Sequence, residues 1–157
     1  MNNTTSLQIL LADDDLDDCL FFKEALEELA LDVAFTAVHD GEQLMHLLTK
    51  NVEVNNFEPL PYILFLDLNM PRKNGFECLN EIKKHSFLKN LPVIVFSTSY
   101  DEEKAHQLYK KGAQFYICKP SEFNQLKKVI HNTVLLVQQN LAPTEENFLL
   151  NKSNNYF

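Results

Sequence analysis

Short runs of apolar residues alternate along the chain with longer stretches in which apolar residues recur every three or four positions. The short runs are rich in β-branched and aromatic residues, as buried strands of parallel sheets are. They cover Leu7–Leu11, Val33–Val38, Tyr62–Leu66, Val93–Phe96 and Gln114–Cys118. Five strands alternating with five helices predict an α/β fold, in which helices cover both faces of a doubly wound parallel sheet.

The longer stretches carry the signals of helix starts and stops. The first has Cys19, Phe22 and Leu26 on one stripe, and Asp15 stands where a residue would cap the N-terminus. The fourth stops at Gly112, the residue type favoured just after a helix. These signals place helix boundaries close to the strand ends.

The chain divides into a domain over residues 6–140 and a tail over residues 141–157. A chain of 157 residues is long enough for one domain with a sizeable core. The tail is polar and Asn-rich around Phe148–Leu150, which predicts either a flexible segment or one that docks on a partner or a second copy. The connection Asn51–Pro61 is long for a helix-to-strand loop, so we expect an excursion there.

Charge and cysteine content narrow the class of function. The net charge of −8 repels phosphate backbones and anionic lipid, which argues against nucleic-acid and membrane partners. The three cysteines are far apart and form no CxxC pair, as expected of reduced thiols in a cytoplasmic protein. No run approaches the ~20 apolar residues of a membrane span.

Polar residues follow four of the predicted strands directly. Asp13 and Asp14 follow the first strand, Asp67 the third, Ser97 the fourth and Lys119 the fifth. The carboxyl ends of parallel strands lie at one edge of the sheet, where ligands bind in open α/β folds. If the first and third strands are neighbours, the three carboxylates share one pocket.

Three carboxylates in one pocket need positive charge. Two unit charges ~4 Å apart repel by about 4 kcal/mol at an effective dielectric constant of 20. Lys119 and a divalent cation such as Mg²⁺, which prefers oxygen ligands, would supply that charge. A carboxylate beside Mg²⁺ and an ammonium is an oxygen nucleophile suited to phosphoryl transfer, and Ser97 could hydrogen bond to a phosphoryl oxygen.

Each of these residues also has a simpler interpretation. The triplet Asp13–Asp15, taken alone, needs no explanation beyond the start of a helix. Asp67 is harder to explain that way, because it follows a fully apolar strand where an ionised group is costly. The coincidence of acids, hydroxyl and lysine at one edge favours the phosphoryl site.

Four segments resemble the receiver domain of two-component response regulators. They read LLADDD, FLDLNMPRKNGFE, PVIVFSTS and GAQFYICKP, in that order, and the resemblance covers roughly residues 6–140. The long connection before the third strand and the DDDLDD opening look most like the small, stand-alone phytochrome-associated regulators. The resemblance implies a flavodoxin-like (βα)5 fold with strand order 2-1-3-4-5.

The resemblance also implies roles for single residues. Asp67 would be the phosphoacceptor. Asp14 would bind Mg²⁺ directly, Asp13 through water, and Asn69 through its backbone carbonyl. Lys119 would bind the phosphoryl group.

Further implied roles concern the switch and the loops. Ser97 would move toward the phosphoryl group and Tyr116 would change rotamer with it, altering the face made by the fourth helix, fifth strand and fifth helix. The peptide before Pro120 would be cis, and Gly75 would adopt a positive φ. Ser97 replaces the threonine common in the family but keeps the hydroxyl.

The implied partners are a histidine kinase, possibly phytochrome-like, and a downstream protein target; a homodimer is also plausible. Two other functions stay open. One is a Mg²⁺-dependent aspartyl-phosphate phosphatase, which needs a general acid where this chain has Asn69. The other is a receiver-like binding scaffold that is not phosphorylated.

Overall fold

Five parallel strands form one sheet in the computed structural model, which describes residues 7–58 and 60–151. The strand order is β2-β1-β3-β4-β5, so the predicted order is confirmed. The strands are β1 Leu7–Ala12, β2 Val33–Val38, β3 Tyr62–Leu66, β4 Val93–Ser97 and β5 Phe115–Cys118. Their carboxyl ends point the same way, which brings the polar residues after them to one edge.

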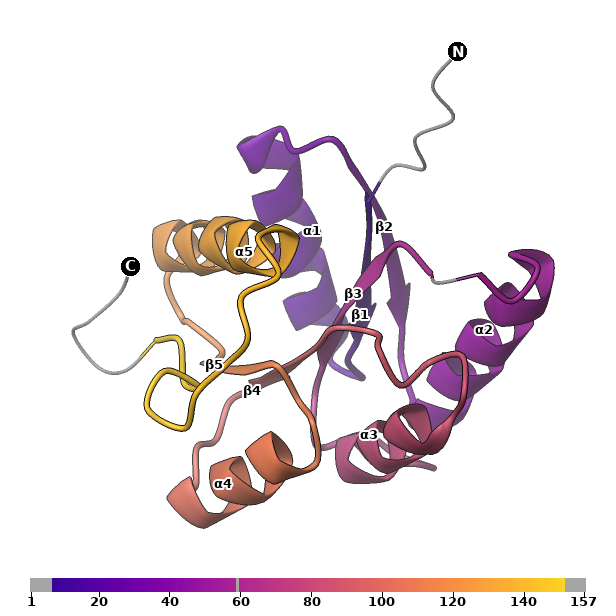
Figure 1. Ribbon diagram of the computed structural model, residues 1–157. Coiled ribbons are helices and arrows are strands. Elements are labelled where there is room, and N and C mark those ends of the chain that lie inside the picture. The colour runs from indigo at the N-terminus through magenta and orange to yellow at the C-terminus, as the bar shows by residue number, and fades with distance from the viewer. Residues whose placement is uncertain (1–6, 59, 152–157) are drawn as a thin grey trace.

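Five helices cover the two faces of the sheet (Figure 1). They are α1 Leu16–Leu29, α2 Gly41–Val54, α3 Gly75–Lys84, α4 Glu102–Lys110 and α5 Phe123–Gln138. Helices α1 and α5 pack side by side on one face, and α2, α3 and α4 cover the other. No helix in the described ranges is long and apolar enough to cross a bilayer.

Strand side chains alternate between two hydrophobic cores, as the pleat requires. In β1, Ile9 points toward α1 and α5, and Leu10 toward the core under α2 and α3. The first core is centred on Phe22, whose ring lies 5.0 Å from that of Phe65 and 5.5 Å from that of Phe96, both edge to face. Both faces of the central strands are therefore dry, which explains their continuous apolar sequence.

Acidic and amide side chains begin most of the helices. Asp15 caps α1 by accepting hydrogen bonds from two backbone amides of its first turn. Asn74 and Glu77 form a capping box at the start of α3. Gly112 follows α4 with φ of 99°, so its predicted position just after the helix is confirmed.

The connection before β3 is shorter than predicted. Helix α2 continues to Val54 because Val52 is buried in the core, and this extends the apolar stripe by one turn. The loop therefore begins at Asn55, and positive φ values at Asn56 and Phe57 turn the chain toward β3.

The predicted tail packs partly on its own chain. Tyr116 N donates to Phe148 O and Leu150 N donates to Tyr116 O, both at 2.9 Å, so residues 148–150 run along the edge of β5. The Phe148 and Leu150 side chains are buried. Neither predicted alternative anticipated this contact, which removes apolar side chains from water and pairs an exposed strand edge. Residues 152–157 of the tail lie outside the described residues.

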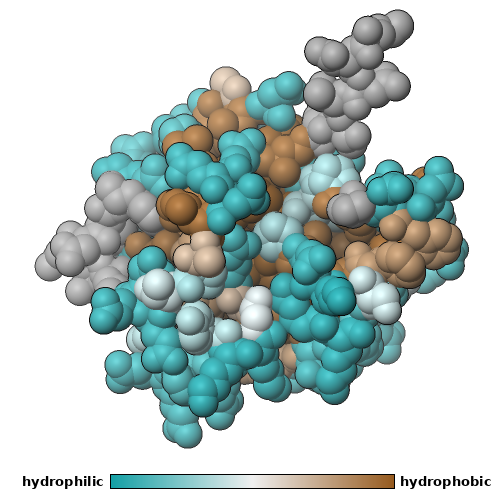
Figure 2. Space-filling view, in the orientation of Figure 1, coloured by the Kyte–Doolittle hydropathy of each residue, from teal (hydrophilic) through white to brown (hydrophobic). Residues whose placement is uncertain are grey.

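The surface has a mixed character in the orientation of Figure 1. Figure 2 shows a hydrophilic surface over α4, whereas hydrophobic side chains gather around α1 and α5. Leu16 and Leu20 of α1 are among the exposed large hydrophobic residues.

Candidate metal centre

Three carboxylates converge at the carboxyl ends of β1 and β3. One oxygen from each of Asp13, Asp14 and Asp67 lies within 4.8 Å of the others. Asp13 and Asp67 are buried, and Asp14 is exposed. The predicted shared pocket is therefore confirmed, since β1 and β3 are neighbours in the sheet.

Backbone hydrogen bonds extend the sheet into this pocket. Asp13 N donates to Val38 O at 3.0 Å, and Asp67 N donates to Ala12 O at 2.9 Å. Each aspartate is thus fixed by a neighbouring strand just past the last strand residue. Rigid positioning of this kind suits a binding or reaction site.

Lys119 brings its amine into the same pocket from the loop after β5. Its Nζ lies 2.7 Å from Asp13 Oδ2 and 3.3 Å from Asp67 Oδ2, and its side chain is 8% exposed. Its backbone N donates to Ser97 O at 2.9 Å. Burial acts to lower the pKa of Lys119, but the contacts of its amine with the accepting carboxylates of Asp13 and Asp18 outweigh burial and raise the pKa above its ordinary value. The amine is therefore an ammonium over the physiological range.

The buried position of Asp13 disfavours its charged form. Burial raises the pKa of Asp13 from 3.8 to about 6, although the hydrogen bond from Lys119 acts to lower it. The Lys119 ammonium alone therefore does not offset the cost of burying the charged Asp13 carboxylate. A divalent cation would stabilise the ionised carboxylate and bring its pKa back down.

Asp18 was not among the predicted site residues. It lies in the first turn of α1, and its Oδ2 accepts a hydrogen bond from Lys119 Nζ at 2.8 Å. Sequence reasoning assigned this acid only to the helix N-terminus, where Asp17 also lies. Its spacing from Asp15 places it one helical turn after the cap, back over the pocket, and that was the available signal.

Ser97 and Tyr116 lie at the β4–β5 side of the site. Ser97 is fully buried; within the described residues its Oγ makes no well-formed hydrogen bond, and it lies near enough to the Tyr116 hydroxyl to act to lower the pKa of that group. A buried hydroxyl without a partner is costly, so it is suited to a ligand oxygen. The hydroxyl of buried Tyr116 donates to Ser99 O, and burial raises its pKa to about 12.

Two predictions about the loops are wrong. The described residues contain no cis peptide bond, so the peptide before Pro120 is trans. Gly75 does not have a positive φ; Arg72 does, at 68°. Gly75 is needed for another reason, because a Cβ there would lie 2.4 Å from Asp67 O. Helix α3 can therefore start against the backbone of the acidic pocket only with glycine at this position.

The donor set fits a hard divalent cation. Its side-chain ligands are carboxylate oxygens, and the exposed Asp14 leaves the pocket open to water. Exposed Asn69 lies beside the pocket, and its backbone N donates to Asp67 Oδ1 at 3.4 Å. The lysine and the free Ser97 hydroxyl add two donors suited to an anionic group beside the cation.

Comparison with known proteins agrees with this geometry. Residues 9–131 match the family described as the response regulator receiver domain. The chain is 34% identical over 122 residues to response regulator Rcp1 of Synechocystis sp., covering 78% of this chain and 82% of Rcp1.

Two solved structures are similar in fold and sequence. The phosphorylated cyanobacterial phytochrome response regulator RcpA superposes with a TM-score of 0.75 and 30% identity, covering 89% of this chain and all of that one. The Mn²⁺-bound form of Rcp1 gives a TM-score of 0.72 and 30% identity, covering 88% of this chain and 99% of that one.

Proposed function

Since the chain belongs to the response regulator receiver domain family, we propose that it is a single-domain response regulator that accepts a phosphoryl group on Asp67 from a partner histidine kinase. The observation that carries the proposal is the position of Asp67. This carboxylate ends β3, is buried, and shares its pocket with two further acids and the Lys119 ammonium.

Asp67 acts as the nucleophile. One of its oxygens forms a bond to phosphorus while the bond from phosphorus to the donor's imidazole nitrogen breaks, and that nitrogen keeps the electron pair. Asn69 N and Lys119 Nζ orient the carboxylate before the transfer. Lys119 and the Ser97 hydroxyl then hydrogen bond to phosphoryl oxygens, which stabilises the charge they carry.

Mg²⁺ is the cofactor of this reaction. The carboxylates of Asp13, Asp14 and Asp67 and the backbone carbonyl of Asn69 would hold it. When bound, it neutralises part of the negative charge on the phosphoryl oxygens.

Signalling follows from the same hydroxyl. As Ser97 engages the phosphoryl group, the segment to Ser99 shifts with it, and the Tyr116 hydroxyl is bonded to Ser99 O. The face made by α4, β5 and α5, with residues 148–150 lying along β5, therefore changes with phosphorylation, and a downstream protein binds that face. The similarity to the phytochrome response regulator RcpA supports a phytochrome-like kinase as the partner, and we place this exchange in the cytoplasm.

Phosphorylation of the purified protein tests the proposal. We expect incubation with Mg²⁺ and acetyl phosphate to add one phosphoryl group, measured by intact-protein mass spectrometry. Asp67→Asn removes the nucleophilic oxygen but keeps the shape, so it should add none. Asp40→Asn, which alters a buried acid outside the pocket, is the matched control and should be phosphorylated normally. Equal labelling of the Asp67→Asn variant would refute the assignment.

A further inference from the structure

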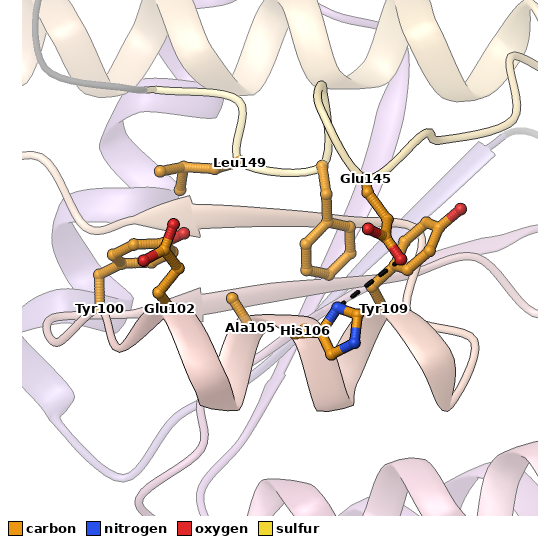
Figure 3. A pocket seen from close by; sticks show the side chains of 8 residues that line it. Tyr100, Glu102, Ala105, His106, Tyr109, Glu145 and Leu149 are labelled. Carbon is orange, nitrogen blue, oxygen red and sulfur yellow. Dashed lines mark ion pairs between the residues drawn. The ribbon is translucent and has the colours of Figure 1, made fainter.

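The C-terminal segment, residues 144–151, covers the open edge of β5. Its backbone is bonded to Tyr116 on both sides, through Phe148 O and Leu150 N. Figure 3 shows Glu145 and Leu149 of this segment facing Ala105 and His106 of α4 across a groove. The groove has a volume of about 210 Å³, and an ion pair of 3.7 Å between His106 and Glu145 crosses it.

The segment ends in a two-point contact with the last residue of β5. Cys118 N donates to Asn151 Oδ1 at 2.9 Å, and Asn151 Nδ2 donates to Cys118 O at 2.6 Å. Asn151 is 9% exposed, so this amide is withdrawn from water to serve one residue. A side-chain amide that bonds both polar groups of one residue fixes that residue as a neighbouring strand would.

Cys118 is directly followed by Lys119. The Lys119 backbone is held on the β4 side by Ser97 O, and Asn151 holds Cys118 on the opposite side. The residue that delivers the ammonium to the acidic pocket is thus fixed from both sides of β5. A long lysine side chain bonds an anion better when its backbone does not move.

Resting on the proposed function, we propose that Asn151 is a positioning residue for Lys119, so that the docked C-terminal segment and a phosphoryl group on Asp67 stabilise each other. The coupling is reciprocal by thermodynamic necessity. A fixed Lys119 binds the phosphoryl group more tightly, and a bound phosphoryl group holds the end of β5 that Asn151 grips. The segment therefore reports on the site while also covering the β5 edge.

The test compares two ligands in the full chain. Beryllofluoride with saturating Mg²⁺ mimics the phosphoryl group, and Mg²⁺ alone probes only the acids. Tyrosine fluorescence reports binding, since the chain has no Trp and Tyr116 lies beside the site. We expect Asn151→Ala to weaken beryllofluoride binding about 5-fold or more. Mg²⁺ affinity should not fall, because the metal ligands follow β1 and β3.

A second variant and a matched control separate positioning from general damage. Asn151→Asp keeps the shape and the acceptor for Cys118 N but loses the donor, so it should also weaken beryllofluoride binding. Asn147→Ala removes the same kind of side chain from an exposed turn of the segment, where Asn147 bonds Thr144. That control should bind beryllofluoride as the wild type does.

Hydrogen exchange tests the reverse direction of the coupling. The Leu150 amide, bonded to Tyr116 O, should exchange more slowly in the wild type when beryllofluoride is bound.

Unchanged beryllofluoride affinity in both Asn151 variants would overturn the proposal, whether or not the segment opens. An equal loss of Mg²⁺ affinity would overturn it too, because the effect would then be structural. A wild type that binds no beryllofluoride would refute the proposed function itself.

Discussion

At the scale of single residues, the site depends on which acceptors receive the three N–H donors of Lys119. Three carboxylates, those of Asp13, Asp18 and Asp67, lie within 3.3 Å of its Nζ. A phosphoryl oxygen must replace one of them. Asp18 is the one given up at least cost, because its side chain is 36% exposed and water can replace the lysine.

Asp18→Asn is therefore expected to tighten beryllofluoride binding. The change removes a competitor for Lys119 and one negative charge near an anionic ligand. Exposed ion pairs contribute about 0.2–1 kcal/mol, which corresponds to a roughly 1.4- to 5-fold change in the dissociation constant. Asp17→Asn changes the charge of the same helix turn without contact with Lys119, so it is the control. Weaker binding in Asp18→Asn would show that Asp18 supports the ligand.

Much of this residue set could be read from the sequence. Asp67 and Lys119 stood out because each follows an apolar strand, where a charge needs a partner. Asp18 did not, since an acid in the first turn of a helix already has an ordinary explanation. The free hydroxyl of Ser97 depends on tertiary contacts, which no local pattern records.

At the scale of elements, the junction between β3 and α3 shapes the pocket. Helix α3 begins at Gly75 against the backbone of Asp67, and its first turn is fixed by the Asn74 capping box. The helix start and the phosphoacceptor are thus one packed unit. A displacement of the helix start is therefore expected to displace Asp67, and the reverse.

Gly75→Ala should lower both stability and Mg²⁺ affinity. The added methyl group would lie 2.4 Å from Asp67 O, so either the strand end or the helix must move. Such overpacking costs about 1–3 kcal/mol in the free energy of unfolding. Asn74→Ala loses the cap, at about 1 kcal/mol, without pressing on Asp67. Urea unfolding and Mg²⁺ titration of both variants separate the effects, and unaltered Mg²⁺ affinity in Gly75→Ala would contradict this account.

Element prediction succeeded where the signal was local. The strand Tyr62–Leu66 was predicted with the observed bounds, because a buried parallel strand is apolar throughout. The docking of Phe148–Asn151 was missed, since the pairing joins β5 to residues more than thirty positions later. The apolar residues of the tail indicated that they would be buried, but not against which surface.

At the scale of the whole molecule, the acidic pocket opposes the stability of the metal-free protein. The pKa of Asp13 is raised from 3.8 to about 6 in the folded state, so the folded protein binds this proton more readily than the unfolded chain. Stability therefore falls as the pH rises from about 4 to 6, and this penalty is complete at pH 7. A shift of this size corresponds to about 3 kcal/mol in the free energy of unfolding.

We expect the metal-free protein to unfold at a higher temperature at pH 5 than at pH 7. Mg²⁺ should raise the unfolding temperature most at pH 7, because it binds the ionised pocket of the folded state. Asp13→Asn lacks the titrating group and should lose most of this pH dependence. Thermal scans with and without Mg²⁺ make the comparison. If the unfolding temperature of the wild type depended on neither pH nor Mg²⁺, the proposed effect of Asp13 on stability would be wrong.

The two edges of the sheet are unequal, and this limits how chains could assemble by strand addition. Within residues 7–58 and 60–151, the outer side of β5 is occupied by Phe148–Leu150, and no segment pairs with the outer side of β2. Strand addition would then use β2 alone. Two copies could join through β2 about a two-fold axis, and growth would stop there because each far edge is already sealed. The same fold with β5 bare could polymerise.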